Sequence, residues 1–281
     1  MVEFDKSYGP AAPELGWVPA PSYLARRQAI LDVLQSLPPG RVLEVGCGAG
    51  ALVYELQDRG FDCTALETSE GARELARAIH GDAREVEFFG EPQNDWQGSF
   101  DYLLSFEVLE HIEHDADALR EWKSWLAPGG LLICSVPAHR RRWSASDVWA
   151  GHFRRYERED LVHLLTECGF AIESVQNYGF PVSNIIAPIR AVYHRRKMQR
   201  QKDLDRAECT ARSGNERHLE VSLYRIQKSF FVRLFLTACF TVQRWCRNRE
   251  LGPGFFAVAR VADEEQAEPR VYMASEQQAL I

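Results

Sequence analysis

The chain has 281 residues, of which 46% are hydrophobic and 26% charged, a composition typical of a globular protein with a full core. Forty acidic residues outnumber 33 basic ones, and the formal charge of −7 argues against non-specific nucleic-acid binding by the whole surface, so we expect no nucleic-acid partner. The seven cysteines form no C-x-x-C pair and no signal peptide opens the chain, so we expect reduced thiols and a cytoplasmic protein.

The first forty residues predict an arm followed by a helix. Residues 1–21 are rich in proline and predict an irregular arm. Ser22 is placed to cap a helix, and Pro38-Pro39-Gly40 is expected to end it. The expected buried face of that helix consists of Ile30, Leu31, Leu34 and Leu37.

Residues 41–60 predict a strand, a glycine turn and a helix. Val42, Leu43 and Val45 are typical of a short buried strand, and the helix is expected over 52–56. The turn between them carries glycine at alternate positions, where a side chain would keep a ligand from approaching the backbone: Gly46, Gly48 and Gly50. This is the first unit of a doubly wound nucleotide-binding sheet.

Two carboxylates narrow the choice of nucleotide ligand. Gly46, Gly48 and Ala51 also satisfy the dinucleotide fingerprint. However, Glu44 in the strand end suits a cationic ligand and would repel a pyrophosphate. Glu67 follows the next apolar run, 61–66, and can accept both hydroxyls of a ribose. A tight glycine turn without a ligand remains the structural alternative.

The stretch Glu44-Val-Gly-Cys-Gly-Ala-Gly50 resembles the first motif of class I S-adenosylmethionine-dependent methyltransferases. Within this class, the stretch resembles the type 11 and type 23 methyltransferases, which are related to ubiquinone-pathway O-methyltransferases. The resemblance implies S-adenosylmethionine as cofactor and an N-terminal segment that folds over it through Tyr8 or Trp17. Arg26, or its neighbour Arg27, is the candidate to pair with the cofactor's carboxylate, and the alternative is that these arginines are solvated. The implied contacts of the first two strand ends are Glu44, Gly46, Cys47, Gly48, Gly50, Glu67 and Thr68.

After a helix over 72–79, residues 86–89 predict the third strand. The family usually places an Asp after this strand to receive the adenine amino group, followed by a residue whose N–H meets the ring. Here Glu91 stands in that place and is expected to accept the amino group. Pro92 follows it and has no N–H to give.

The second half of the chain extends the resemblance. Residues 100–106 predict the fourth strand, and the segment Glu107-Val-Leu-Glu-His111 after it matches the family. Further strands are expected over 131–136, 170–178 and 255–262, with the last inserted antiparallel between the fifth and the sixth. The expected fold is a doubly wound, seven-stranded α/β sheet, with its core in 22–180 and 254–263. At the fourth strand's end, the residues expected to face the methionine part of the cofactor are Ser105, Phe106 and Glu107.

Two segments carry candidate chemistry. Glu107, Glu110 and His111 resemble an E-x-x-E-H metal site of ubiquinone-pathway O-methyltransferases, but the same letters occur in relatives without metal, so we expect no metal and a bracing role. The loop 137–156 follows the fifth strand and contains a G-H-x-R-R-Y element. We expect His152 to act as general base, with His111 as the alternative, and Tyr156 to orient the acceptor. The arginines of this loop either hold an anionic substrate or bind helix ends.

The segment 181–253 is longer than a connection between two strands needs and predicts a helical insert. Between residues 188 and 250 it has fifteen Lys or Arg residues against six Asp or Glu. Its longest uncharged stretch, 234–243, is too short to span a bilayer. An apolar stripe from Leu223 to Val242 with flanking basic residues predicts a substrate lid, a homodimer contact or an anionic lipid surface. The tail, 264–281, is acidic and polar, and we expect it to be disordered.

These features predict methyl transfer from S-adenosylmethionine to an oxygen or nitrogen of a small-molecule acceptor, with oxygen favoured. One alternative is a lipid-linked or macromolecular acceptor docked on the basic insert. Another is a cofactor-binding module without catalysis, which the altered Glu91-Pro92 corner keeps open. A nicotinamide dehydrogenase is disfavoured by Glu44.

Overall fold

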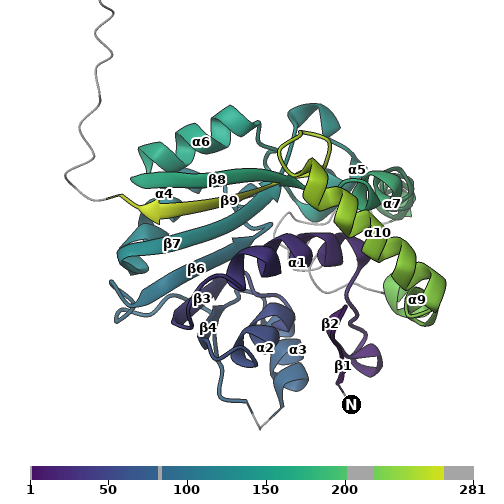
Figure 1. Ribbon diagram of the computed structural model, residues 1–281, viewed down its shortest axis with the longest axis horizontal. Coiled ribbons are helices and arrows are strands. Elements are labelled where there is room, and N and C mark those ends of the chain that lie inside the picture. Colours follow the sequence, from purple (N-terminus) through teal and green to yellow (C-terminus); the bar gives the residue numbers. More distant parts are fainter. Residues whose placement is uncertain (1, 82–83, 201–217, 263–281) are drawn as a thin grey trace, which may run out of the picture.

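The computed structural model describes residues 2–81, 84–200 and 218–262 (Figure 1). The tail predicted over 264–281 and the part of the basic insert over 201–217 lie outside the described residues.

A seven-stranded sheet forms the centre of the molecule, with strand order β5-β4-β3-β6-β7-β9-β8. β9 pairs antiparallel with both β7 and β8, and the other neighbouring strands pair in parallel. The predicted fold class and the placing of the last strand between the fifth and the sixth are therefore confirmed. The strands are β3 (Arg41–Val45), β4 (Asp62–Leu66), β5 (Glu87–Phe89), β6 (Phe100–Phe106), β7 (Leu126–Pro137), β8 (Phe170–Tyr178) and β9 (Gly254–Val261).

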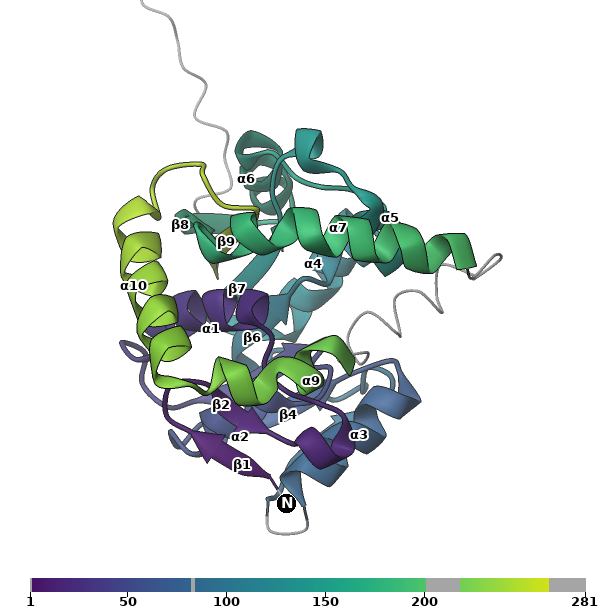
Figure 2. The ribbon, with the colours of Figure 1, turned by 90° about the vertical axis from the view of Figure 1, so that its right-hand side faces the viewer.

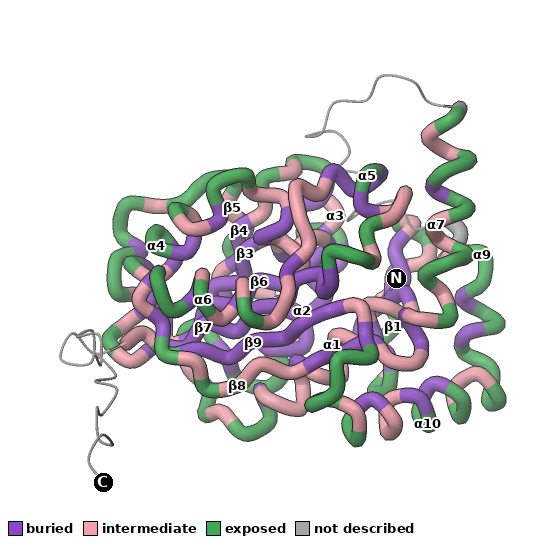
Figure 3. The backbone as a smooth tube through the Cα atoms, turned by 90° about the horizontal axis from the view of Figure 1, so that it is seen from above, coloured by how far each residue is buried: buried purple, intermediate pink, exposed green. Residues whose placement is uncertain are grey.

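Helices cover both faces of this sheet, and each face has its own apolar core. On one face, α1 (Pro21–Leu34), α2 (Ala51–Gln57) and α3 (Glu70–His80) bury Ile30 and Leu56 against the strands. On the other, α4 (Asp115–Trp125) and α6 (Arg158–Glu167) bury Trp122 and Leu161. The central strands β3, β6, β7 and β9 consist largely of buried residues, drawn in purple in Figure 3, which explains why they contain near-continuous apolar runs.

The start of α1 differs from the prediction. Ala20, not Ser22, is the N-cap residue, and Pro21 occupies the first helical turn. Proline suits that position because its fixed φ matches the helix and its missing N–H would have had no partner there.

The N-terminal segment is not an irregular arm as predicted. It forms an antiparallel hairpin of β1 (Glu3–Asp5) and β2 (Gly9–Ala11), followed by the short helix η1 (Pro13–Leu15). A buried ion pair between Arg27 and Glu55 lies beneath it, and Arg27 Nη1 donates to the carbonyl of Ser7 at 3.1 Å. Gly9 has a φ of +77°, and a Cβ there would lie 2.5 Å from Glu55 Oε1. The hairpin is thus fixed to α1 and α2 by side chains distant in sequence.

Three further helices lie together on one side of the molecule: α7 (Val182–Arg200), α9 (His218–Gln227) and α10 (Phe230–Cys246) (Figure 2). α7 packs on α5 (Ala145–Ala150) and α1, and α10 packs on α1. Gln243 fixes α10 in place, because its amide accepts from Gly179 N and donates to the carbonyl of Ala25, both at 2.8 Å. Within the described residues, no helix is both long and apolar enough to cross a membrane.

Candidate active site

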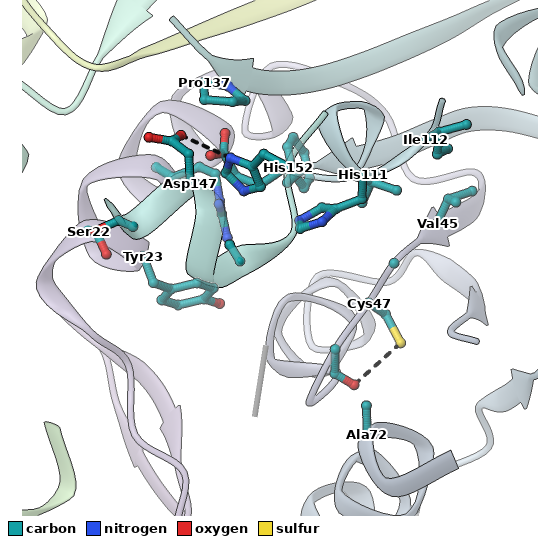
Figure 4. A pocket seen from close by; sticks show the side chains of 18 of the residues that line it. Ser22, Tyr23, Val45, Cys47, Ala72, His111, Ile112, Pro137, Asp147 and His152 are labelled. Carbon is teal, nitrogen blue, oxygen red and sulfur yellow. Dashed lines mark hydrogen bonds and ion pairs between the residues drawn. The ribbon is translucent and has the colours of Figure 1, made fainter. Parts of the chain in front are cut away.

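A cavity of about 1310 Å³ opens at the carboxyl ends of β3, β6 and β7 (Figure 4). Its walls come from the glycine turn after β3, from α1, from the loop after β7 and from the inner side of α7. This is where an open parallel sheet places its ligands. The predicted residues that line it are Arg26, Glu44, Gly46, Cys47, Gly48, Glu67, Thr68, Phe106, Glu107, His111 and His152.

The glycines of the turn serve different purposes. A Cβ at Gly46 would lie 2.4 Å from the Val108 side chain, whereas a Cβ at Gly48 would meet nothing within 4 Å. Gly48 therefore presents bare backbone to the cavity. Gly50 caps α2 and does not line the cavity; a Cβ there would lie 3.0 Å from His80 Nε2, so packing requires this glycine.

Glu67 is held at the cavity edge by two backbone amides. Its Oε2 accepts from Gly48 N and its Oε1 from Ser69 N, each at 2.9 Å. A carboxylate has about four lone-pair sites, so two of them stay open for further donors. This arrangement fits a ligand with a pair of hydroxyl groups.

Glu44 on the β3 side of the cavity, and Arg26 and Tyr23 on the α1 side, each have a buried polar atom without a hydrogen-bond partner among the described residues. Glu44 is buried, and its Oε2 has no hydrogen-bond partner among the described residues. Burial raises the pKa of Glu44 to about 8, although the charge of Arg26 opposes that rise. The buried Nε of Arg26 has no hydrogen-bond partner among them either. A ligand with a cationic and an anionic group would satisfy Glu44 and Arg26, which is the pattern of an amino acid.

Glu107 follows β6 in a left-handed conformation, with a φ of +59°. Such a conformation is costly for a residue with a side chain and occurs where the surroundings enforce it. Tyr178 OH and Ser135 Oγ donate to Glu107 Oε1 at 2.6 and 3.0 Å, and Glu107 N donates to the carbonyl of Ser135. The ends of β6, β7 and β8 are thus joined through one carboxylate that faces the cavity.

The loop after β7 supplies a histidine and the carboxylate that orients it. Asp147 Oδ1 lies 3.0 Å from His152 Nδ1 and accepts from Arg155 Nε at 2.7 Å (Figure 4). Burial alone would raise the pKa of Asp147, but the hydrogen bonds from His152 and Arg155 outweigh it and lower that pKa to about 2. An ionised carboxylate only accepts, so Nδ1 of His152 carries the proton, and Nε2 of the neutral ring has an open lone pair.

His111 and Glu110 lie against this ring. The His111 and His152 rings meet edge to face with their centres 4.7 Å apart. Burial, and secondarily the charge of His152, lower the pKa of His111 to about 3, so His111 is neutral at physiological pH. Glu110 is fully buried, its Oε1 is 3.8 Å from His152 Nε2, and neither of its oxygens has a hydrogen-bond partner within the described ranges. Burial, followed by the charge of Glu107, raises its pKa well above the usual range.

Four predicted site residues do not reach the cavity wall: Gly50, Glu91, Ser105 and Tyr156. The expected role of Tyr156 in orienting the acceptor is wrong, because its ring is buried in the core and its hydroxyl donates to Asp115 Oδ2 at 2.8 Å. Glu91 is exposed beside the cavity-lining Pro92, and Ser105 is buried in β6.

For the predicted N-terminal cover, the structure distinguishes the two candidates. Trp17 lines the cavity, whereas Tyr8 is buried and its hydroxyl donates to the carbonyl of Gln227 at 2.9 Å.

Among the cavity-lining residues that sequence reasoning missed are Asp147, Tyr178 and Arg190. Only Asp147 had a local signal. Ser144 and Asp147 form a capping box at the start of α5, a spacing that can be read from the sequence. Its second role, on His152, depends on the turn that follows the helix.

A methyltransferase-domain profile matches residues 23–175. The ubiquinone biosynthesis O-methyltransferases of Caulobacter sp. (strain K31) and Bordetella avium (strain 197N) are 36% and 30% identical to the chain over 102 and 117 residues. These alignments cover 34% and 40% of this chain but only 40% and 48% of the two relatives, so the chain spans less than half of their length.

Among solved structures, phosphoethanolamine N-methyltransferase 2 of Haemonchus contortus in complex with S-adenosyl-L-methionine matches with a TM-score of 0.52. It is 15% identical, and the match covers 85% of this chain and 53% of that one. At this identity the likeness shows the fold alone.

The hydrogen bonds of Glu67 lead to a first prediction. The variant Glu67→Ala should weaken binding of S-adenosylmethionine by about 1–3 kcal/mol, the range for leaving hydrogen-bond partners of a charged group unmet. Titration calorimetry measures this change. Unchanged affinity, or tight binding of NAD by the wild type, would contradict the role of Glu67.

The buried carboxyl of Glu44 predicts a pH-dependent affinity. With a pKa of about 8 it is mostly protonated at pH 7, and a cationic ligand selects its ionised form. Affinity for S-adenosylmethionine should therefore rise with pH up to about 8 and then level off. The Glu44→Gln variant should bind more weakly and lose the component of the pH dependence that Glu44 contributes. If wild type and variant show parallel pH curves, Glu44 does not contact the cation.

A third prediction concerns metal. Ligating atoms of Glu110, His111 and His152 lie within 4.8 Å of one another. This set differs from the Glu107, Glu110 and His111 that resemble a family metal site, since Glu107 bonds Tyr178 and Ser135 instead. Because burial and the charge of Glu107 disfavour the ionised form of Glu110 that a metal would need, we expect EDTA to leave methyl transfer unchanged. Bound metal in the purified protein by mass spectrometry, with turnover lost in EDTA and restored by Mg²⁺ or Zn²⁺, would contradict this.

Proposed function

The chain belongs to the methyltransferase-domain family, and we propose that it transfers a methyl group from S-adenosylmethionine to a hydroxyl oxygen of a small-molecule acceptor. The observation that carries the choice of oxygen is the pairing of Asp147 with His152 in the cavity wall. A hydroxyl group gives up a proton when it is methylated, so it gains from a positioned base, whereas a neutral amine can attack without one.

The cavity residues fit the cofactor at three places. Glu67 and the bare backbone at Gly48 suit its ribose, and the open atoms Glu44 Oε2 and Arg26 Nε suit the amino and carboxylate groups of its methionine part. When bound, S-adenosylmethionine supplies a methyl group already activated by the positive charge on sulfur. The chain's remaining task is to position the acceptor and to receive its proton.

His152 is the residue that receives the proton. The bond to Asp147 fixes the ring orientation and leaves Nε2 as the basic atom, and the ionised Asp147 stabilises the imidazolium that forms. His111 is neutral beside it and does not add a competing positive charge. Arg155 bonds Asp147 as well, so it holds the carboxylate in place and supports the histidine indirectly.

Other cavity residues favour an acceptor with a negative group. Arg142 and Arg190 line the same cavity, and neither forms an ion pair within the described part of the chain. Arg190 Nη1 lies 3.4 Å from Ser22 Oγ, a long contact that leaves most of its donors open. The two curated relatives are named O-methyltransferases, which supports oxygen as the acceptor atom. A hydroxybenzoate combines a phenolic hydroxyl with a carboxylate and is the acceptor class to test first.

The test replaces each member of the pair. His152→Ala should lower kcat with hydroxybenzoate acceptors by about 10²–10⁴-fold, the usual contribution of a positioned base, while affinity for S-adenosylmethionine stays unchanged. Asp147→Asn should lower kcat as well, because an amide no longer selects the productive tautomer. Transfer of a labelled methyl group measures the rate.

His163→Ala serves as the matched control, since His163 is exposed on α6, where it pairs with Glu167. A wild-type kcat in His152→Ala would make His152 structural and leave His111, or no base, as the alternatives. Faster methylation of amines than of any hydroxyl acceptor would contradict the choice of oxygen.

A further inference from the structure

Large apolar side chains are exposed mainly on one side of the protein. Of the sixteen large apolar residues exposed within the described ranges, eleven lie on α7, α9 and α10. These helices lie on the side that faces the viewer in Figure 2, around α1 and the N-terminal hairpin. Scattered exposed apolar residues are normal, but a concentration of this kind marks an interaction site.

α10 is apolar on two opposite faces. Its inner face buries Leu236 and Cys239 together with Gln243. Its outer face carries Phe231, Leu234 and Phe235 at helical spacing and, three turns further on, Trp245. Phe231 is 80% exposed and Trp245 is 78% exposed. Because the inner face already fixes the helix, the outer stripe is not needed to hold α10 in the fold.

α9 and α7 continue the exposed apolar surface. Leu223 and Ile226 are exposed on α9, near the turn into α10. On α7, Ile185, Ile189 and Val192 are exposed at spacings of four and three residues, so they share one outward face. We call the exposed apolar residues of these three helices the outer apolar surface.

Basic residues outnumber acidic ones on the three helices that carry this surface. Neither α7 nor α10 contains an acidic residue, whereas α7 carries five Lys or Arg residues and α10 two. Lys228 and Arg233 border the stripe and pair with Glu3 and Asp5 of the hairpin. Arg225 on α9 and Arg247 directly after α10 are exposed, and neither forms an ion pair with any described residue. The rest of the chain is strongly acidic, so the excess of basic residues is local to this insert.

We propose that the outer apolar surface docks the protein on an anionic lipid bilayer. Aromatic and aliphatic side chains flanked by basic residues match the boundary between acyl chains and negative headgroups. A second copy of this chain is a poorer partner. A symmetric contact through the same surface would bring basic residues against basic residues, and the three helices carry a single carboxylate, Glu220 on α9, to neutralise them.

The docking does not depend on the proposed reaction, but it bears on how an acceptor arrives. α7 has its outer residues in the outer apolar surface, while Ile186, Ala187 and Arg190 line the cavity from the same helix. A single helix therefore separates the proposed bilayer from the cavity.

Co-sedimentation with vesicles tests the proposal. The full chain should sediment with phosphatidylcholine vesicles that contain phosphatidylglycerol and much less with pure phosphatidylcholine, and high salt should reduce binding. The double variant Phe231→Ser/Trp245→Ser should bind the anionic vesicles at least about tenfold more weakly, since it removes two large apolar contacts. Arg225→Glu/Arg247→Glu should abolish the preference for anionic lipid.

Leu15→Ser is the matched control, an exposed apolar residue on η1 outside this surface, and it should bind like the wild type. Binding of S-adenosylmethionine and the Tm of each variant show that the fold is intact, as expected for substitutions at exposed positions. Equal binding of wild type and double variant would overturn the proposal. So would a wild type that does not bind vesicles but forms a dimer in sedimentation velocity that Phe231→Ser/Trp245→Ser dissociates.

Discussion

The cavity depends on how the chain keeps carboxyl groups out of water at the ends of its strands. An isolated buried carboxylate is costly, so each must have donors, a proton or a ligand. Glu107 and Asp147 have donors, and they hold the strand ends and the histidine ring in place. Glu44 and Glu110 have no donor on one or both oxygens, and their pKa values are raised. The hydrogen-bonded carboxylates, Glu107 and Asp147, make the site rigid. Glu44 and Glu110 mark where the site still requires a positive charge or a proton.

The fold could be predicted because its signals are local. Apolar runs, glycines after strands and caps before helices lie within a few residues of the elements that they specify. The order of the strands in the sheet was expected from the family that the glycine turn resembles. The N-terminal hairpin could not be predicted in this way. Its position depends on Arg27 paired with Glu55 and on Tyr8 bonded to residue 227, contacts between segments that only the folded chain brings together.

The same distinction applies to the site. Glu44, Gly48 and Glu67 lie in or directly after the first two strands, so their place at the cavity followed from the sheet alone. Which side chains of the loop after β7 face the cavity could not be predicted without the conformation of each turn in that loop. His152 and Tyr156 are four residues apart, but one ring faces the cavity and the other faces the core, because Asp115 on α4 accepts the hydroxyl of Tyr156. Proximity in sequence predicted a shared role that the backbone does not permit.

α7 connects the two halves of the functional proposal. Its inner face offers apolar side chains and the guanidinium of Arg190 to the cavity, and its exposed side offers apolar side chains together with Arg195 and Arg196. An acceptor with a polar, negatively charged head and an apolar tail satisfies both environments, since the head would reach Arg190 while the tail stays near the bilayer. The chemistry and the docking are nevertheless separable, because the base lies on the loop after α5 and the most exposed aromatic residues lie on α10. Membrane association would therefore act on the supply of acceptor, and the Asp147–His152 pair on the rate of methyl transfer once the acceptor is bound.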